Sequence, residues 1–138
     1  MAIGGLSVSD AQAVQSRVIL LAEDDPINVE IVKHILSQLP DVELVVACDG
    51  RAALETALGR RFDLMIFDRN MPHITGDRVI RHIKAAKTLN DSTPIIQFTA
   101  DADRVTLTGG TNPFADAIVP KPVQAAQLLS VVTHLLAN

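Results

Sequence analysis

Five side chains that could perform phosphoryl chemistry stand directly after short apolar runs of the sequence. Glu23 and Asp24 follow the first of these runs, and Asp68 follows another. Thr99 and Lys121 follow two more. If the runs are neighbouring strands, the three carboxylates meet in a small space, where their mutual repulsion calls for a cation. Oxygen ligands with room for water suit Mg²⁺, and a metal, an ammonium and a hydroxyl around one carboxylate form a phosphoryl site. Asp68 is the expected nucleophile, which would become an aspartyl phosphate.

The elements that must position these residues alternate between apolar runs and helical patterns. Strands are predicted at 17–22, 42–47, 63–67, 94–98 and 115–119. Helices are predicted at 26–39, 52–58, 77–87 and 123–136. Strands with so few alternating polar residues are typical of a parallel sheet that is covered on both faces. Right-handed crossovers then give a doubly wound (βα)5 fold of the α/β class, whose ligands bind beyond the carboxyl ends of the strands.

The helix predicted over 26–39 shows its start clearly. Asp25 is a plausible N-cap, and Pro26 suits the first helical position. A helical periodicity places four residues on one apolar stripe, with Val32 and Leu36 beside it; the stripe consists of Ile27, Ile31, Ile35 and Leu39.

Composition and charge exclude several classes of protein. The 138 residues are 48% hydrophobic and 20% charged, which is enough apolar material for a core and excludes global disorder. A net charge of −4, with no Trp and no Tyr, argues against nucleic-acid binding. The single cysteine, Cys48, cannot form an internal disulfide and is expected in the core. No apolar run approaches the ~20 residues of a membrane span, and no signal peptide is recognisable at the start. We therefore expect a cytoplasmic protein without membrane contact.

The domain organisation is predicted to be simple. Residues 1–16 are rich in Gly, Ser, Ala and Gln and are interpreted as a flexible lead or linker, and residues 17–138 as one domain. Within the 138 residues we expect no additional DNA-binding or enzymatic output domain. A stand-alone protein and a domain of a larger kinase both stay open.

Four motifs together resemble one known family. They are the runs ILLAED at 19–24, DLMIFDRNMP at 63–72, PIIQFTA at 94–100 and IVPKP at 118–122. With them, the chain from about Arg17 to Leu136 resembles the receiver domain of two-component response regulators. The resemblance implies a flavodoxin-like, five-stranded parallel sheet in the order 2-1-3-4-5. It also implies a stoichiometric phosphoacceptor and not a turnover enzyme. Such a phosphoacceptor is expected to catalyse its own phosphotransfer and autodephosphorylation.

The resemblance also assigns roles to the candidate residues. Asp68 would accept a phosphoryl group from a phosphohistidine on a sensor histidine kinase or a histidine phosphotransfer protein. Asp24 and Asp68 would ligate Mg²⁺ directly, the Asn70 backbone carbonyl would be a third ligand, and Glu23 would act through a metal-bound water. Thr99 and Lys121 would bind phosphoryl oxygens. The bond between Lys121 and Pro122 is expected to be cis, as is typical of the family.

Three departures from the family pattern bear on the switch. Ile118 stands where many members have an aromatic residue, which puts the usual coupling of Thr99 to that position in doubt. The segment 103–113 contains two glycines and a proline, so its helix is expected to be short or mobile and to end near residue 108. We expect the main change on phosphorylation between Ala102 and Phe114. Arg69 follows the acceptor and is interpreted as an exposed loop cation that could pair with loop acids.

Two alternatives in other functional classes remain at this stage. One is a degenerate receiver that serves only as a protein-binding scaffold, against which the intact set of site residues argues. The other is a haloacid-dehalogenase-like phosphatase, which also uses an aspartyl phosphate. That family places its nucleophile after the first strand, where this chain has Glu-Asp-Asp-Pro at 23–26.

Overall fold

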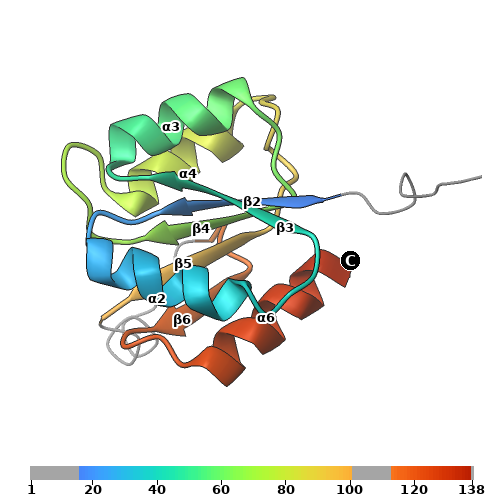
Figure 1. The fold of residues 1–138 in the computed structure, drawn as a ribbon. Helices are drawn as coiled ribbons and strands as arrows, with labels where there is room; N and C mark the ends of the chain where they lie inside the picture. Colours follow the sequence, from blue (N-terminus) through green and yellow to red (C-terminus); the bar gives the residue numbers. More distant parts are fainter. Residues whose placement is uncertain (1–15, 101–112, 138) are drawn as a thin grey trace, which may run out of the picture.

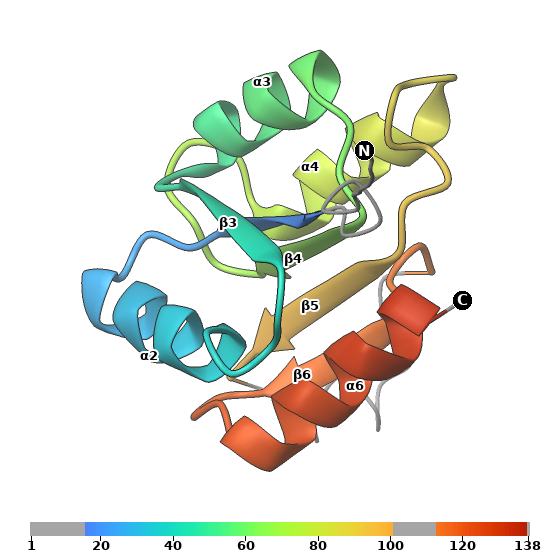
Figure 2. The same ribbon diagram turned by 45° about the vertical axis from the view of Figure 1, so that its right-hand side comes forward.

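The computed structural model describes residues 16–100 and 113–137, and Figures 1 and 2 show its ribbon. Within these residues, the chain forms five strands and four helices. The strands are β2 (Arg17–Ala22), β3 (Val42–Ala47), β4 (Leu64–Asp68), β5 (Ile95–Thr99) and β6 (Ala117–Pro120). The helices are α2 (Pro26–Leu36), α3 (Gly50–Gly59), α4 (Gly76–Ala85) and α6 (Ala125–Ala137). These nine elements confirm the predicted strands and helices, with ends that differ by a few residues.

The strands form one parallel sheet in the order β3-β2-β4-β5-β6. Numbered along the chain, this order is 2-1-3-4-5, which confirms the predicted flavodoxin-like doubly wound fold. Ala22 at the end of β2 is in register with Phe67, and Asp68 at the end of β4 is in register with Phe98. Because all strands run in one direction, the residues that follow them lie along one edge of the sheet.

Helices cover both faces of this sheet. α3 and α4 pack on one face, and α2 and α6 pack on the other (Figures 1 and 2). Since alternate residues of a strand point to opposite faces, Met65 and Phe67 pack toward α3 and α4, whereas Leu64 and Ile66 pack toward α2 and α6. All four side chains are fully buried. Asp68 therefore stands at the end of a strand that is packed on both sides.

Side-chain caps set the starts of the helices. The Ile27 N–H donates to Asp25 Oδ1 at 2.9 Å, and Pro26 is the first residue of α2, as predicted. α3 begins at Gly50, earlier than predicted. Its N-cap is Asp49, whose Oδ1 accepts a hydrogen bond from the Ala52 N–H at 2.8 Å.

The apolar stripe predicted on α2 is only partly a core face. Ile27 is 70% exposed and Ile31 is 42% exposed. The buried residues of α2 are Val32, Ile35 and Leu36. The helix therefore carries apolar side chains on an outer face as well as on its inner face. Periodicity alone does not distinguish these two faces, because the apolar residues of one continue into the other.

The amino edge of the sheet, opposite the candidate site, is closed by hydrogen bonds. The fully buried Asn90 side chain accepts from the Phe62 N–H at 2.8 Å and donates to the Ala57 carbonyl at 2.6 Å. Lys84 Nζ donates to the carbonyl oxygens of Asn90 and Thr93 at 3.2 and 2.6 Å. Burial lowers the pKa of Lys84. These contacts tie α3 and α4 to the loops that enter β4 and β5.

Some predictions are corrected here and others fall outside the described residues. Cys48, expected in the core, is exposed at the end of the edge strand β3. The predicted short helix in 103–113 and most of the predicted switch between Ala102 and Phe114 coincide with residues 101–112, outside the described part of the chain. All but one residue of the predicted lead at 1–16 also lies outside it. Over residues 16–100 and 113–137, no helix has the length and apolar character needed to cross a bilayer.

Candidate functional site

Three acidic side chains and one lysine meet at the carboxyl edge of the sheet. Glu23 and Asp24 follow β2, and Asp68 ends the neighbouring strand β4. Each of the three offers a carboxylate oxygen within 4.8 Å of the other two. Lys121 Nζ, which follows β6, lies 3.0 Å from Asp68 Oδ2 and 3.2 Å from Glu23 Oε1. The structure thus brings together four residues that the sequence placed after three separate strands.

Burial raises the free-energy cost of ionising the inner carboxyl groups of this cluster. Glu23 has no exposed surface, and Asp68 is 3% exposed. Burial, and after it the neighbouring Asp68 carboxylate, raise the pKa of Glu23 from 4.5 to about 7, against the lowering effects of the Asp25 N–H and Lys121. Glu23 Oε2 accepts from the Asp25 N–H at 3.2 Å. Glu23 Oε1 is buried and, within the described residues, accepts no hydrogen bond of good geometry; the Lys121 ammonium at 3.2 Å is its ion-pair partner.

Lys121 is held as a cation by the acids around it. Burial by itself lowers the pKa of Lys121, but its hydrogen bond to Asp68 and the charges of Asp68 and Glu23 outweigh burial and raise the pKa. The Lys121 N–H also donates to the Thr99 carbonyl at 3.0 Å, which joins the ends of β5 and β6. The peptide bond between Lys121 and Pro122 is cis, as the resemblance implies.

The remaining predicted residues lie at different distances from the cluster. Thr99 ends β5, the strand next to β4, and is 2% exposed. The Asn70 N–H donates to Asp68 Oδ1 at 3.4 Å, so the Asn70 backbone lies beside the acceptor carboxylate. Ile118 lies within β6, half-buried and in register with Gln97 rather than with Thr99. It is therefore a neighbour of the site and not a member of the acidic cluster.

The residues present fit a divalent cation. Three carboxylates face one ammonium, so the cluster keeps an excess of negative charge when all are ionised. In the described part of the chain, no well-aligned hydrogen-bond donor reaches the buried Glu23 Oε1. Asp24 is exposed, so one side of the cluster is open to solvent and to water ligands. Hard oxygen ligands with room for water are the donor set that Mg²⁺ prefers.

A second polar cluster lies beside the site and was not predicted from the sequence. Arg69 Nε donates to Asp77 Oδ2 at 3.1 Å, and Gln97 Nε2 donates to Asp77 Oδ1 at 2.7 Å. Arg69 is thus only partly exposed, and the acid it pairs with belongs to α4 rather than to the loop. The available signal was Gln97 itself, because it is a polar residue in the apolar run PIIQFT and is 3% exposed.

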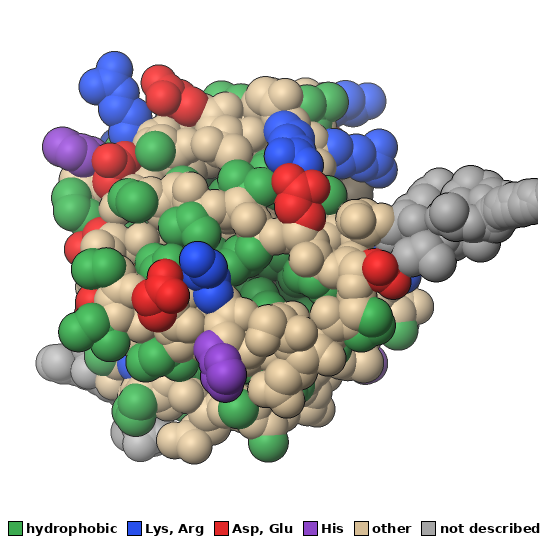
Figure 3. Space-filling view, viewed as in Figure 1, with side chains coloured by type: hydrophobic (Ala, Val, Ile, Leu, Met, Phe, Trp, Pro, Cys, Tyr) green, Lys and Arg blue, Asp and Glu red, His purple; other side chains and the backbone are tan. Residues whose placement is uncertain are grey.

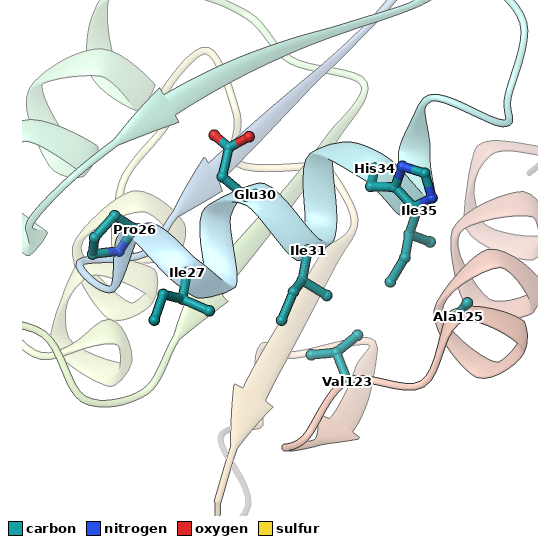
Figure 4. Close-up of a pocket in the computed structure, with 8 residues that line it drawn as sticks. All are labelled: Pro26, Ile27, Glu30, Ile31, His34, Ile35, Val123 and Ala125. Carbon is teal, nitrogen blue, oxygen red and sulfur yellow. The ribbon is translucent and has the colours of Figure 1, made fainter.

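An apolar groove beside α2 was also not predicted. It has a volume of about 730 Å³ and lies between the outer face of α2 and the start of α6. Figure 4 shows Ile27 and Ile31 on α2 pointing toward the side of Val123. Figure 3 shows hydrophobic side chains at the surface over α2, next to charged ones. Because Pro26 follows Glu23-Asp24-Asp25 and Val123 follows Lys121-Pro122, the groove adjoins the acidic cluster.

Comparisons with known proteins agree with this architecture. The chain is 30% identical over 118 residues to the response regulator ArlR of Staphylococcus saprophyticus, covering 86% of this chain and 51% of ArlR. It is 32% identical over 125 residues to the autoinducer 2 sensor kinase/phosphatase LuxQ of Vibrio vulnificus, covering 90% of this chain and 14% of LuxQ. The chain therefore spans about half the length of ArlR and a much smaller part of the length of LuxQ.

Solved structures give the same picture. The receiver domain of sensor histidine kinase PA1611 from Pseudomonas aeruginosa, which has a magnesium ion coordinated in its active site cleft, superposes with a TM-score of 0.77 at 26% identity over 89% of this chain and 99% of that domain. The chemotaxis response regulator CheY4 of Vibrio cholerae gives 0.77 at 27% identity, with 88% of this chain and 99% of CheY4 covered.

A match to a family model identifies the family of this chain. The family model of the response regulator receiver domain matches residues 19–133, which include every predicted site residue. This assignment argues against the alternative of a haloacid-dehalogenase-like phosphatase. The chain belongs to the response regulator receiver domain family of two-component signalling proteins.

Proposed function

We propose that Asp68 accepts a phosphoryl group from a phosphohistidine and that this modification switches or relays a signal. One observation carries the proposal: the buried Asp68 carboxylate stands 3.0 Å from the Lys121 ammonium and within 4.8 Å of the Glu23 and Asp24 carboxylates. A receiver that acts only as a scaffold has no need to hold three acids and a lysine in such a costly arrangement. The intact cluster therefore favours phosphoacceptor chemistry over a scaffold.

The proposed transfer is a displacement at phosphorus. A carboxylate oxygen of Asp68 forms the new P–O bond as the P–N bond to the donor imidazole breaks. The imidazole nitrogen keeps the electron pair of that bond and takes up a proton from solvent. Lys121 compensates negative charge on the transferring oxygens, and the Thr99 hydroxyl donates a hydrogen bond to one of them. In autodephosphorylation, water attacks the same phosphorus and Asp68 leaves as a carboxylate.

Mg²⁺ is the cofactor of this proposal. Asp24, Asp68 and the Asn70 carbonyl would hold it directly, and Glu23 through a water. When bound, it supplies positive charge that neutralises the phosphoryl oxygens. The exposed Asp24 leaves that side of the site open to water.

The switch is proposed to begin at Thr99. Its hydroxyl reaches the added phosphoryl oxygens by moving toward Asp68, which vacates space on the face of β5 and β6 where Ile118 lies. An isoleucine has no polar handle, so its rearrangement brings little specific energy. The larger change is therefore expected in the chain that follows β5.

The donor is proposed to be a sensor histidine kinase or a histidine phosphotransfer protein, and to dock on the groove beside α2. LuxQ and the osmosensing histidine protein kinase SLN1 of Saccharomyces cerevisiae are kinases by their names, and each contains a segment related to this chain. The exposed Ile27 and Ile31 offer an apolar surface on the helix that follows Glu23 and Asp24. Ile31→Asp should slow transfer from such a protein and leave transfer from acetyl phosphate unchanged, which separates docking from chemistry.

The deciding experiment is phosphorylation by acetyl phosphate with Mg²⁺, followed by intact mass. The wild type should gain one phosphoryl group that is lost in base and retained in acid. Asp68→Asn should gain none, because an amide is a poor nucleophile. The exposed Asp91 lies at the opposite edge of the sheet, so Asp91→Asn is the matched control and should behave like the wild type. Full phosphorylation of Asp68→Asn would remove Asp68 from its proposed role.

A further inference from the structure

The polar cluster of Arg69, Asp77 and Gln97 lies beside the acidic cluster, on the sheet face that α3 and α4 cover. Gln97 on β5 is in register with Phe67 on one side and Ile118 on the other. Phe67 packs toward α4. Gln97 points the same way, since its Nε2 donates to Asp77 on α4 at 2.7 Å. A buried amide thus joins the strand that ends in Thr99 to the first turn of α4.

Arg69 connects this cluster to the acceptor. The Arg69 N–H donates to the Phe98 carbonyl at 3.0 Å, and the Arg69 carbonyl accepts from the Gly76 N–H at 3.0 Å. The backbone of Arg69 is therefore fixed to β5 by its N–H and to the first residue of α4 by its carbonyl. Because Arg69 is the link between the acceptor and Asn70, any shift of Arg69 moves the Asn70 backbone.

Asp77 is held in place from two directions. The first turn of α4 packs tightly on β4, because a Cβ on Gly76 would overlap the Asp68 carbonyl oxygen. Asp77 is the next residue, and its two carboxylate oxygens accept from different elements, one from Arg69 and one from Gln97. Its side chain cannot turn without breaking one of these bonds. The carboxylate is thus a fixed anchor for Arg69, whose side chain is about two-thirds buried.

We propose that Asp77 is a positioning residue of the phosphoacceptor site. Bonded to Gln97 on β5, it anchors Arg69 and thereby fixes the backbone of Asn70, whose carbonyl is the third proposed Mg²⁺ ligand. The inference rests on the proposed function. Asp77 itself touches neither the metal nor the phosphoryl group, and its effect reaches them through Arg69.

The test compares Mg²⁺ affinity with thermal stability in a set of variants. Mg²⁺ binding is read from the NMR shift of the Asn70 amide, and stability from thermal unfolding in EDTA. Asp77→Ala and Arg69→Ala should each weaken Mg²⁺ binding about 10-fold, the usual effect of losing a group that orients a ligand. Glu43→Ala is the matched control: it removes the Glu43–Arg60 ion pair of 3.0 Å at the amino edge of the sheet and should leave Mg²⁺ affinity unchanged.

A double variant separates positioning from simple stabilisation. In Asp77→Ala the buried Gln97 amide loses its acceptor, which lowers stability. Adding Gln97→Leu removes that unpaired amide, so the double variant should regain stability while its Mg²⁺ affinity stays low. Affinity that returns together with stability, or wild-type affinity in Asp77→Ala, would overturn the inference. A wild type that binds no Mg²⁺ at Asn70 would overturn the proposed metal site and this inference together.

Discussion

Replacing Glu23 by Gln should make the protein more stable at neutral pH when Mg²⁺ is absent. The Glu23 carboxylate is fully buried beside Asp68, and its Oε1 has no hydrogen-bond partner among the described residues. Glutamine has nearly the same shape and keeps an oxygen that can accept from the Asp25 N–H. It carries no charge, so it removes the repulsion with Asp68.

The sign and the size follow from the pKa of Glu23, which the fold raises from 4.5 to about 7. Between these two values the folded protein binds more protons than the unfolded chain. The stability of the wild type therefore falls as the pH rises through this window, and the loss is complete above it. One pKa unit corresponds to about 1.4 kcal/mol. The gain in Glu23→Gln should reach up to about 3 kcal/mol at pH 8 and vanish near pH 4.5.

Urea unfolding followed by far-UV circular dichroism measures this difference, since the chain has no Trp or Tyr for fluorescence. The two proteins are compared from pH 5 to pH 8 in EDTA, and again with Mg²⁺. Added Mg²⁺ should reverse the order of stability, because the cation favours the carboxylate over the amide. Parallel pH profiles of the wild type and Glu23→Gln in EDTA would refute the reasoning.

Other substitutions probe the two edges of the sheet. Asp24→Asn should lower Mg²⁺ affinity and the phosphorylation rate together; undiminished phosphorylation of the wild type in EDTA would contradict the metal assignment. Asn90→Ala should lower the free energy of unfolding by about 2 kcal/mol or more in urea titrations, because buried backbone groups lose their partners, and should leave Mg²⁺ affinity unchanged. Gly76→Ala should reduce both stability and phosphorylation, because its Cβ overlaps the Asp68 carbonyl. In Gly59→Ala the added Cβ meets no atom within 4 Å, so the free energy of unfolding should rise by about 0.5 kcal/mol in the same urea titrations.

The strands and the acidic cluster could be predicted from the sequence because both depend on local patterns. The apolar runs that carry the site end at polar residues, and a parallel sheet brings such ends to one edge regardless of the loop conformations. The positions of Glu23, Asp24, Asp68 and Lys121 therefore required only the strand ends and the strand order.

The features that were missed depend on contacts between distant residues. The pairing of Arg69 with Asp77 and of Asp77 with Gln97 joins a loop, a helix and a strand. The polar Gln97 in an apolar run marked one member, but no local pattern identified its partners. The outer face of α2 could not be distinguished for a different reason. Ile27 and Ile31 continue the helical period of the buried residues, and periodicity does not state which apolar residues meet the core.

The two edges of the sheet are held by different kinds of side-chain contact. We therefore expect local opening to be easier at one edge than at the other. Asn90 and Lys84 lock the amino edge through hydrogen bonds to backbone carbonyls. At the carboxyl edge, backbone hydrogen bonds such as that from Lys121 to Thr99 are present, but the side chains there are joined by ion pairs among crowded charges. Local opening is cheapest where few stable contacts must break, so amide hydrogen exchange should be faster at the loops after β2, β4 and β6 than at those before β4 and β5. The end of the domain that would receive the signal is then its more easily opened end, while the other end serves as a stable base.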